Sequence, residues 1–91
     1  MPDAVIIIFE ETPNPDALKL TLNRPVAAQG KTYRGDPAAA EAPWAKALLA
    51  IPGVLGVYGV NNFISINKRP EADWQEIVAQ AEPALKAIYG P

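Results

Sequence analysis

Short apolar runs, separated by prolines, glycines and asparagines, mark the secondary structure of this chain. Residues Val5 to Glu10 form a β-branched run that is apolar at odd and even positions alike. This is typical of a strand buried on both faces, or covered by a helix and by the chain ends. From Leu18 to Leu22, leucine alternates with polar residues, which predicts a strand with its leucines pointing inward. We expect these two strands to form an antiparallel pair.

A second hairpin is predicted in the other half of the chain. The runs Val54 to Val60 and Phe63 to Lys68 flank Asn61 and Asn62, and asparagine tolerates the positive φ angles of a two-residue turn. Gly56 and Gly59 interrupt the first of these runs. Glycines inside a strand indicate a bulge, or the close approach of a bulky group.

Two helices follow from the apolar spacing. Pro43 to Ala50 places Trp44, Leu48 and the following Ile51 on one face, as in an amphipathic helix. The last helix begins at Asp73, which suits the N-cap position. Its apolar stripe contains Trp74, Ile77, Val78, Ala81, Leu85 and Ile88.

The prolines complicate both helical regions. Pro83 lies inside the apolar stripe and cannot donate to the carbonyl of Ala79, so we expect a kink or break near residues 79–82. Asp36 and Pro37 could open a helix before the one at Pro43. Between residues 24 and 37 we expect a turn at Gln29 and Gly30 and only a short edge strand from Lys31 to Tyr33, with Tyr33 packing on the core.

These elements predict an α+β fold in the order β-β-α-β-β-α. Two hairpins and two helices fit a two-layer sandwich, with one antiparallel sheet and both helices on one face. The 91 residues suffice for one domain over residues 1–91 and not for two.

Composition excludes several classes of function. The chain has 8 basic and 10 acidic residues without a basic cluster, which argues against nucleic acid as a partner. It contains no cysteine and no histidine, so thiolate catalysis, Cys/His zinc sites and Ser-His-Asp machinery are excluded. No acidic residue stands beside a nucleophile in a catalytic motif, and we expect no enzymatic activity.

Nothing in the apolar runs predicts a secretory signal or a membrane span. The first run is short and is preceded by acidic Asp3, whereas a signal peptide has a basic start and a longer apolar core. We therefore expect a soluble cytoplasmic protein without a membrane partner.

The loop between the first two strands, residues 11–17, is the main candidate for a binding surface. Two prolines make it stiff, so presenting it to a partner costs little conformational entropy. Thr12, Asn14, Asp16 and Lys19 offer hydrogen bonds to a partner protein, although the same residues could serve only to cap the hairpin. Trp44 and Trp74 either seal the ends of the core or, if exposed, are interface hot spots.

Carboxylates near the same loop raise an alternative. Glu10, Glu11 and Asp16 lie at its two ends and could bind a hard metal ion weakly. The alternative function is thus a carboxylate-based metal-ion (iron) or small-molecule binding module. A solvated hairpin end that discourages edge pairing explains the same residues.

The residues Thr12-Pro13-Asn14-Pro15, followed by Leu18-Lys19, resemble the TPNP-x-x-LK signature of the Nfu/NifU N-terminal domain family. Further landmarks of the family occur in the same order at Ile51–Val54, Val57–Gly59, Phe63–Lys68 and Trp74. The resemblance covers about Val5 to Ile88. Asn62 stands where the family often has aspartate, so a partner contact that needs an acid at this turn is not implied. Asn62 itself remains a candidate partner contact.

The resemblance implies a function in iron–sulfur cluster assembly. In full-length relatives the cluster ligands are a Cys-x-x-Cys pair in a separate C-terminal domain, and this chain is expected to be a stand-alone N-terminal domain. It would bind no cofactor directly and would meet an iron–sulfur cluster only through a partner chain. The resemblance thus implies a non-catalytic adaptor whose partners are iron–sulfur assembly proteins or apo-targets.

Overall fold

A five-stranded antiparallel sheet organises the fold over residues 5–90, which the computed structural model describes. The elements follow the chain as β1 (Ile7–Glu11), β2 (Ala17–Leu22), β3 (Ala27–Arg34), the 3₁₀ turn η1 (Pro37–Ala39), α1 (Pro43–Leu49), β4 (Val54–Asn61), β5 (Phe63–Lys68) and α2 (Trp74–Tyr89). In the sheet the strands lie in the order β1-β2-β5-β4-β3.

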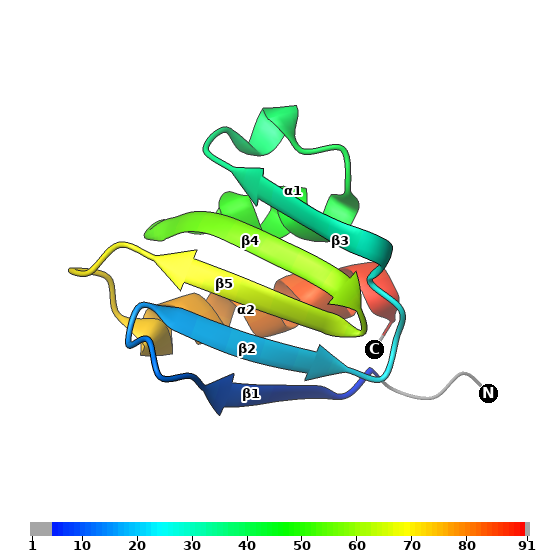
Figure 1. The fold of residues 1–91 in the computed structure, drawn as a ribbon, viewed down its shortest axis with the longest axis horizontal. Helices are drawn as coiled ribbons and strands as arrows, with labels where there is room; N and C mark the ends of the chain where they lie inside the picture. The colour runs from blue at the N-terminus through cyan, green and yellow to red at the C-terminus, as the bar shows by residue number, and fades with distance from the viewer. Residues whose placement is uncertain (1–4, 91) are drawn as a thin grey trace.

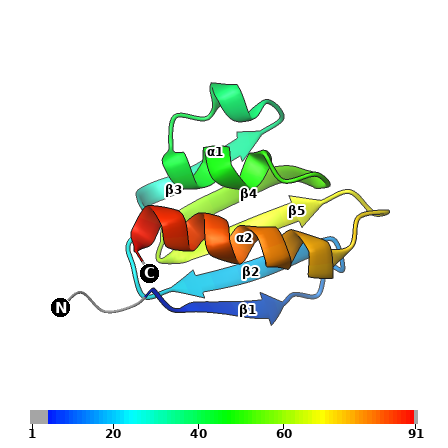
Figure 2. The ribbon, with the colours of Figure 1, turned by 180° about the vertical axis from the view of Figure 1, so that it is seen from behind.

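Both α-helices cover the same face of the sheet (Figures 1 and 2). The predicted α+β class, the two-layer arrangement and the antiparallel sheet with two helices on one face are therefore confirmed. The two predicted hairpins are also present, since β1 pairs with β2 and β4 pairs with β5, antiparallel in both cases. The predicted element order was wrong by one strand, because β3 is a full member of the sheet.

β3 is longer than the predicted edge strand from Lys31 to Tyr33. It pairs with β4 through an irregular register between Ala27 and Lys31, so the expected turn at Gln29 and Gly30 is an irregular part of a continuous strand. Gly30 lies under the side chain of Tyr58, whose hydroxyl occupies the place that a Cβ would take.

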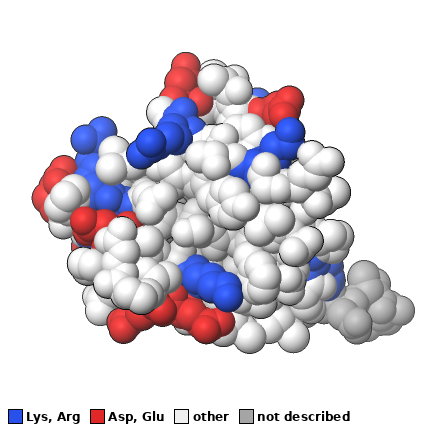
Figure 3. Space-filling view, viewed as in Figure 1, with Lys and Arg blue, Asp and Glu red and all other residues white. Residues whose placement is uncertain are grey.

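The other face of the sheet is not covered by any element of residues 5–90 (Figure 3). Ile6 and Ile8 are 58% and 53% exposed, so the prediction that the first strand is buried on both faces was wrong for its even positions. Figure 3 also shows acidic side chains gathered at the lower margin of this face, where β1 ends in Figure 1.

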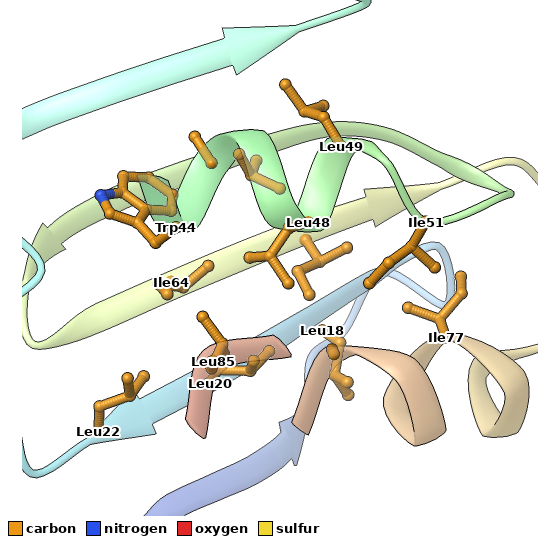
Figure 4. Close-up of a cluster of buried hydrophobic side chains, with 14 of the residues drawn as sticks. Leu18, Leu20, Leu22, Trp44, Leu48, Leu49, Ile51, Ile64, Ile77 and Leu85 are labelled. Atoms are coloured by element: carbon orange, nitrogen blue, oxygen red, sulfur yellow. The ribbon is translucent and has the colours of Figure 1, made fainter. Parts of the chain in front are cut away.

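The core lies between the sheet and the helices, and Figure 4 shows its side chains. The alternating leucines of β2, namely Leu18, Leu20 and Leu22, are buried as predicted. They pack with residues of α1, β5 and α2, including Leu48, Ile64, Ile66, Ile77 and Leu85.

The aromatic residues Trp44 and Tyr33 close the α1 end of the core. Trp44 is buried, and its ring meets that of Tyr33 edge-on at 5.7 Å between centroids. The predicted packing of Tyr33 on the core is confirmed, and Trp44 seals the core rather than being exposed. Partial burial, together with the Glu41 carboxylate that accepts its hydrogen bond, raises the pKa of the Tyr33 hydroxyl.

The helix boundaries follow the capping residues. Asp36 caps only the short turn η1, and α1 begins at Pro43 as predicted. Asp73 caps α2 by accepting a hydrogen bond from the backbone N–H of Gln75. The expected break near Pro83 is absent, because α2 is continuous through Pro83. Ala79, whose carbonyl loses its helical donor, is exposed, so water can satisfy that carbonyl.

The hairpin turn between β4 and β5 has the predicted two-residue form. Val60 pairs with Phe63, and Asn61 adopts a positive φ of 54°. Among the helices formed by residues 5–90, none combines the length and apolar character that crossing a membrane requires. Residues 1–4 and 91, at the ends of the predicted domain, and with them Asp3, lie outside the described residues.

Gly59 tests how tightly Trp44 packs on β4. A Cβ added at Gly59 would lie 2.5 Å from Cη2 of Trp44 and 2.9 Å from Cγ1 of Val26, so the sequence-based expectation of a bulky neighbour is confirmed. We predict that Gly59→Ala lowers the free energy of unfolding, measured by urea denaturation, by about 1–3 kcal/mol through overpacking. In a Trp44→Phe background the same substitution should cost less, and an equal cost would contradict this contact as the cause.

Candidate functional site

The proline loop, residues 11–17 between β1 and β2, is held by its own polar side chains. The Thr12 hydroxyl oxygen lies 2.9 Å from the carbonyl oxygens of both Asn14 and Ala17. The Asn14 side-chain carbonyl accepts the backbone N–H of Asp16 at 2.9 Å, as in an Asx turn. These bonds satisfy backbone groups of the loop locally and, with the two prolines, make the loop rigid.

A buried ammonium group attaches this loop to the end of β5. Lys68 is only 7% exposed, and its Nζ lies 3.1 Å from Asp16 Oδ1 and within 3.3 Å of the carbonyl oxygens of Arg69 and Pro70. The Trp74 ring lies beside the same ammonium, with its centroid at 5.6 Å. Each partner compensates part of the cost of removing the ammonium from water.

Trp74 attaches the loop to α2 as well. Its indole Nε1–H donates to the carbonyl oxygen of Pro15 at 2.9 Å, and the ring packs against the core while remaining partly exposed. From the sequence, Trp74 is predicted either to seal an end of the core or, if exposed, to be an interface hot spot. In the structure the ring lies in the junction between the proline loop and the first turn of α2.

Between the proline loop, β1 and α2 lies a groove of about 800 Å³. We call it the loop–helix groove. Apolar groups make up most of its surface. Its lining residues are Phe9, Glu11 to Pro15, Ala17, Leu18, Trp74, Gln75, Val78 and Ala79. The bonds from Lys68 and Trp74 to the loop fix one wall of this groove relative to the other.

The residues predicted to contact partners do not gather in one place. Thr12, Asn14 and Asp16 belong to the loop and bond within it or to Lys68. Lys19 lies on the uncovered face of the sheet, with its ammonium 4.2 Å from the centroid of the Phe63 ring.

Asn62 lies at the opposite end of the sheet from the proline loop. Its side-chain amide donates to the carbonyl oxygen of Leu22 at 2.9 Å, and its own backbone carbonyl accepts the N–H of Leu22. Asn62 therefore ties the β4–β5 turn to the end of β2. A role of these residues in binding a partner stays a prediction.

The carboxylates considered as metal ligands do not converge. Glu10 and Glu11 are consecutive strand residues, so their side chains point to opposite faces, while Asp16 pairs with Lys68. Within residues 5–90, no group of three or more Asp, Glu, His or Cys side chains is arranged to hold a metal ion.

Sequence reasoning missed the role of Lys68 and the contribution of α2 to the groove. The sequence contained a signal for Lys68, because the alternation of Ile64, Ile66 and Lys68 places it on the buried side of β5. For Val78 and Ala79 there was none, since their helical spacing says nothing about which strand or loop they face.

The fold and the groove together define a small α+β domain with a mostly apolar groove beside a proline-stiffened hairpin. Residues 7–90 match the family model described as "Scaffold protein Nfu/NifU N terminal". The chain belongs to this family.

Within the aligned segments, curated relatives are identical to this chain at more than a third of the positions. This chain is similar to the protein of Drosophila erecta named "NFU1 iron-sulfur cluster scaffold homolog, mitochondrial", with 36% identity over 76 residues. The aligned segment covers 81% of this chain and 27% of that protein. This chain is 38% identical over 79 residues to "Uncharacterized protein YpgR" of Bacillus subtilis, covering 85% of this chain and 21% of YpgR. The chain thus spans about a quarter of the length of these relatives.

Solved structures share the fold over most of both chains. The crystal structure of protein SAV1430 from Staphylococcus aureus superposes with a TM-score of 0.72 at 28% identity, over 87% of this chain and 96% of SAV1430. The solution structure of SeR13 from Staphylococcus epidermidis gives a TM-score of 0.67 at 31% identity, over 91% and 96% of the two chains.

The attachment of the proline loop can be tested through Asp16. Asp16→Asn removes the charge partner of a buried ammonium; because Asp16 is itself 38% exposed, we expect a loss of roughly 1–2 kcal/mol rather than the full cost of a broken buried pair. Urea denaturation measures this loss, and the indole N–H resonance of Trp74 should shift because the loop carries its acceptor.

Glu82→Gln is the matched control. It breaks the exposed pair between Glu82 and Lys86 within α2, which should change stability by less than about 0.5 kcal/mol and leave the Trp74 resonance in place. Equal losses for the two variants would show that the Lys68–Asp16 pair does not hold the loop.

Proposed function

We propose that this chain is a non-catalytic adaptor domain in iron–sulfur cluster assembly, which binds assembly proteins or apo-target proteins while another polypeptide segment supplies the cluster ligands. Membership of the Nfu/NifU N-terminal family and the iron–sulfur scaffold names of its relatives motivate the proposal. The observation that carries it is the loop–helix groove, a mostly apolar surface whose walls are fixed by bonds from Lys68 and Trp74 to the proline loop.

The chemistry of the chain favours binding over cluster ligation. Iron–sulfur clusters are held by cysteine thiolates, in some cases with histidine, and these 91 residues contain neither. A cluster would therefore be contacted only through a partner chain, and no cofactor is proposed for the domain itself.

The geometry of the groove favours a protein partner. A surface whose walls are already fixed loses little conformational entropy on binding, and here Trp74 and Lys68 hold the loop against α2. The groove of about 800 Å³ is mainly apolar, and the buried centre of a protein interface is apolar in the same way.

A capture experiment with groove variants tests the proposal. The immobilised chain is incubated with native lysate, and retained proteins are identified and quantified by mass spectrometry. We expect iron–sulfur assembly proteins or their apo-targets to be retained. Ala79→Arg places a long charged side chain in the groove from an exposed position and should reduce their recovery about tenfold, which corresponds to ~1.4 kcal/mol of binding free energy.

Ala87→Arg is the matched control for this experiment. It makes the same substitution at another exposed position of α2 that is not part of the groove lining, and recovery should stay at the level of the unmodified chain. Retention of no iron–sulfur assembly protein or target, across several salt concentrations, would contradict the proposed function.

A further inference from the structure

The two edges of the sheet differ in how well they resist pairing with another strand. β3 forms one edge and combines an irregular register with the charged residues Lys31 and Arg34; bulges and basic residues are known protections of an edge. β1 forms the other edge and has a regular register with β2 over all five of its residues. Its first three residues, Ile7 to Phe9, carry no charge.

The hydrogen-bonding groups of β1 that face away from β2 can be identified from the register. Ile6 accepts the N–H of Asn23 on the β2 side. In an antiparallel pair the groups of successive residues point to opposite sides, so Ile8 and Glu10 also bond to β2. The N–H and C=O groups of Ile7, Phe9 and Glu11 point outward, where β1 has no further strand among the described elements.

The loop–helix groove runs beneath this free edge. Phe9 and Glu11 of β1 line it on one side, and Val78 and Ala79 of α2 line it on the other. In Figure 2, β1 lies at the edge of the sheet, below α2 and not covered by it. A strand added beside β1 would direct every second side chain toward the helix side of the sheet, and those side chains would enter the groove.

The charge at this edge selects among possible strands. Glu10 lies opposite Lys19 in the β1–β2 register, and Glu11 lies opposite Leu18. Among the described residues neither glutamate forms an ion pair, and the groove lining contains Glu11 but no basic residue. A segment with lysine or arginine near these two carboxylates would gain favourable electrostatics, whereas an acidic segment would be repelled.

We infer that the occupant of this site is an extended segment of a partner protein, apolar at alternate positions and basic at one end, which pairs with β1 as a sixth strand. Its backbone bonds to Ile7, Phe9 and Glu11, its apolar side chains fill the loop–helix groove, and its basic end lies against Glu10 and Glu11. This is strand addition to a sheet edge. The inference rests on the proposed function and specifies how the partner is bound.

A synthetic peptide tests the pairing directly. The probe is a capped peptide about seven residues long, typical of a strand, in which valine alternates with threonine and two lysines end the sequence. In hydrogen exchange followed by NMR, its addition should slow the amides of Ile7, Phe9 and Glu11, while those of Ile8 and Glu10, already bonded to β2, remain unchanged. Slowing without this alternation, or no slowing at millimolar peptide, would overturn the inference.

Modified peptides distinguish backbone pairing from non-specific binding without altering the protein. Two peptides are compared, one N-methylated at its odd-numbered residues and one at its even-numbered residues. Each lacks the backbone donors on one side of the strand only. One of these two peptides should therefore lose about fivefold in affinity for each missing bond, as a hydrogen bond worth about 1 kcal/mol implies, and the other should bind almost unchanged. Replacing both lysines by glutamate should weaken binding at least about fivefold. Equal binding by all of these peptides contradicts the inference.

Variants of Glu11 separate the charge from the backbone donor. Glu11 is exposed, and proline is tolerated in edge strands. Glu11→Gln removes only the charge, and Glu11→Pro removes the outward N–H as well, so the proline variant should bind the lysine peptide several-fold more weakly than the glutamine variant. Ile8→Thr, on the uncovered face, should bind as the unmodified chain does.

The same variants distinguish failure of this inference from failure of the proposed function. If Glu11→Pro captures iron–sulfur assembly proteins from lysate as well as the unmodified chain, the adaptor role stands and strand addition at β1 is wrong. If the outward amides are slowed with rising protein concentration in the absence of peptide, a second copy of the chain occupies the edge, which also overturns the inference.

Discussion

The arrangement of the loop–helix groove depends on one buried ammonium group. Lys68 ends β5, the central strand of the sheet, and its charge is surrounded by the Asp16 carboxylate, two backbone carbonyls and the Trp74 ring. An ammonium of this kind is tolerated inside a protein only while its partners remain in place. The proline loop and the start of α2 are therefore held at the same point of the sheet.

This constraint changes the meaning of the polar residues in the proline loop. Thr12, Asn14 and Asp16 look like an exposed set of hydrogen-bonding groups, yet each uses its side chain to shape or attach the loop. These bonds fix the position of one wall of the groove. The groups that remain accessible beside the loop include the outward backbone groups of β1 and the apolar side chains of the groove. A motif of polar residues in the sequence does not indicate either of them.

The sequence was informative wherever a local pattern has a single structural solution. Alternating leucines in β2 and the asparagine pair between β4 and β5 correctly predicted a buried face and a two-residue turn. Prediction failed where tertiary contacts outweigh local preference. Pro83 does not end α2, since Ala81 and Leu85 on either side of it are buried in the core. The groove was not predictable, because it forms between segments that are distant in the chain.

The two tryptophans differ in their surroundings, and this makes the domain its own optical reporter. Trp44 is buried against Tyr33, whereas Trp74 is partly exposed at the rim of the groove and donates its indole proton to Pro15. Indole fluorescence depends on the polarity around the ring, so contacts made in the groove should change the emission of Trp74 and leave that of Trp44 unchanged. A chain with Trp44 replaced by phenylalanine would thus report occupancy of the groove without any attached dye.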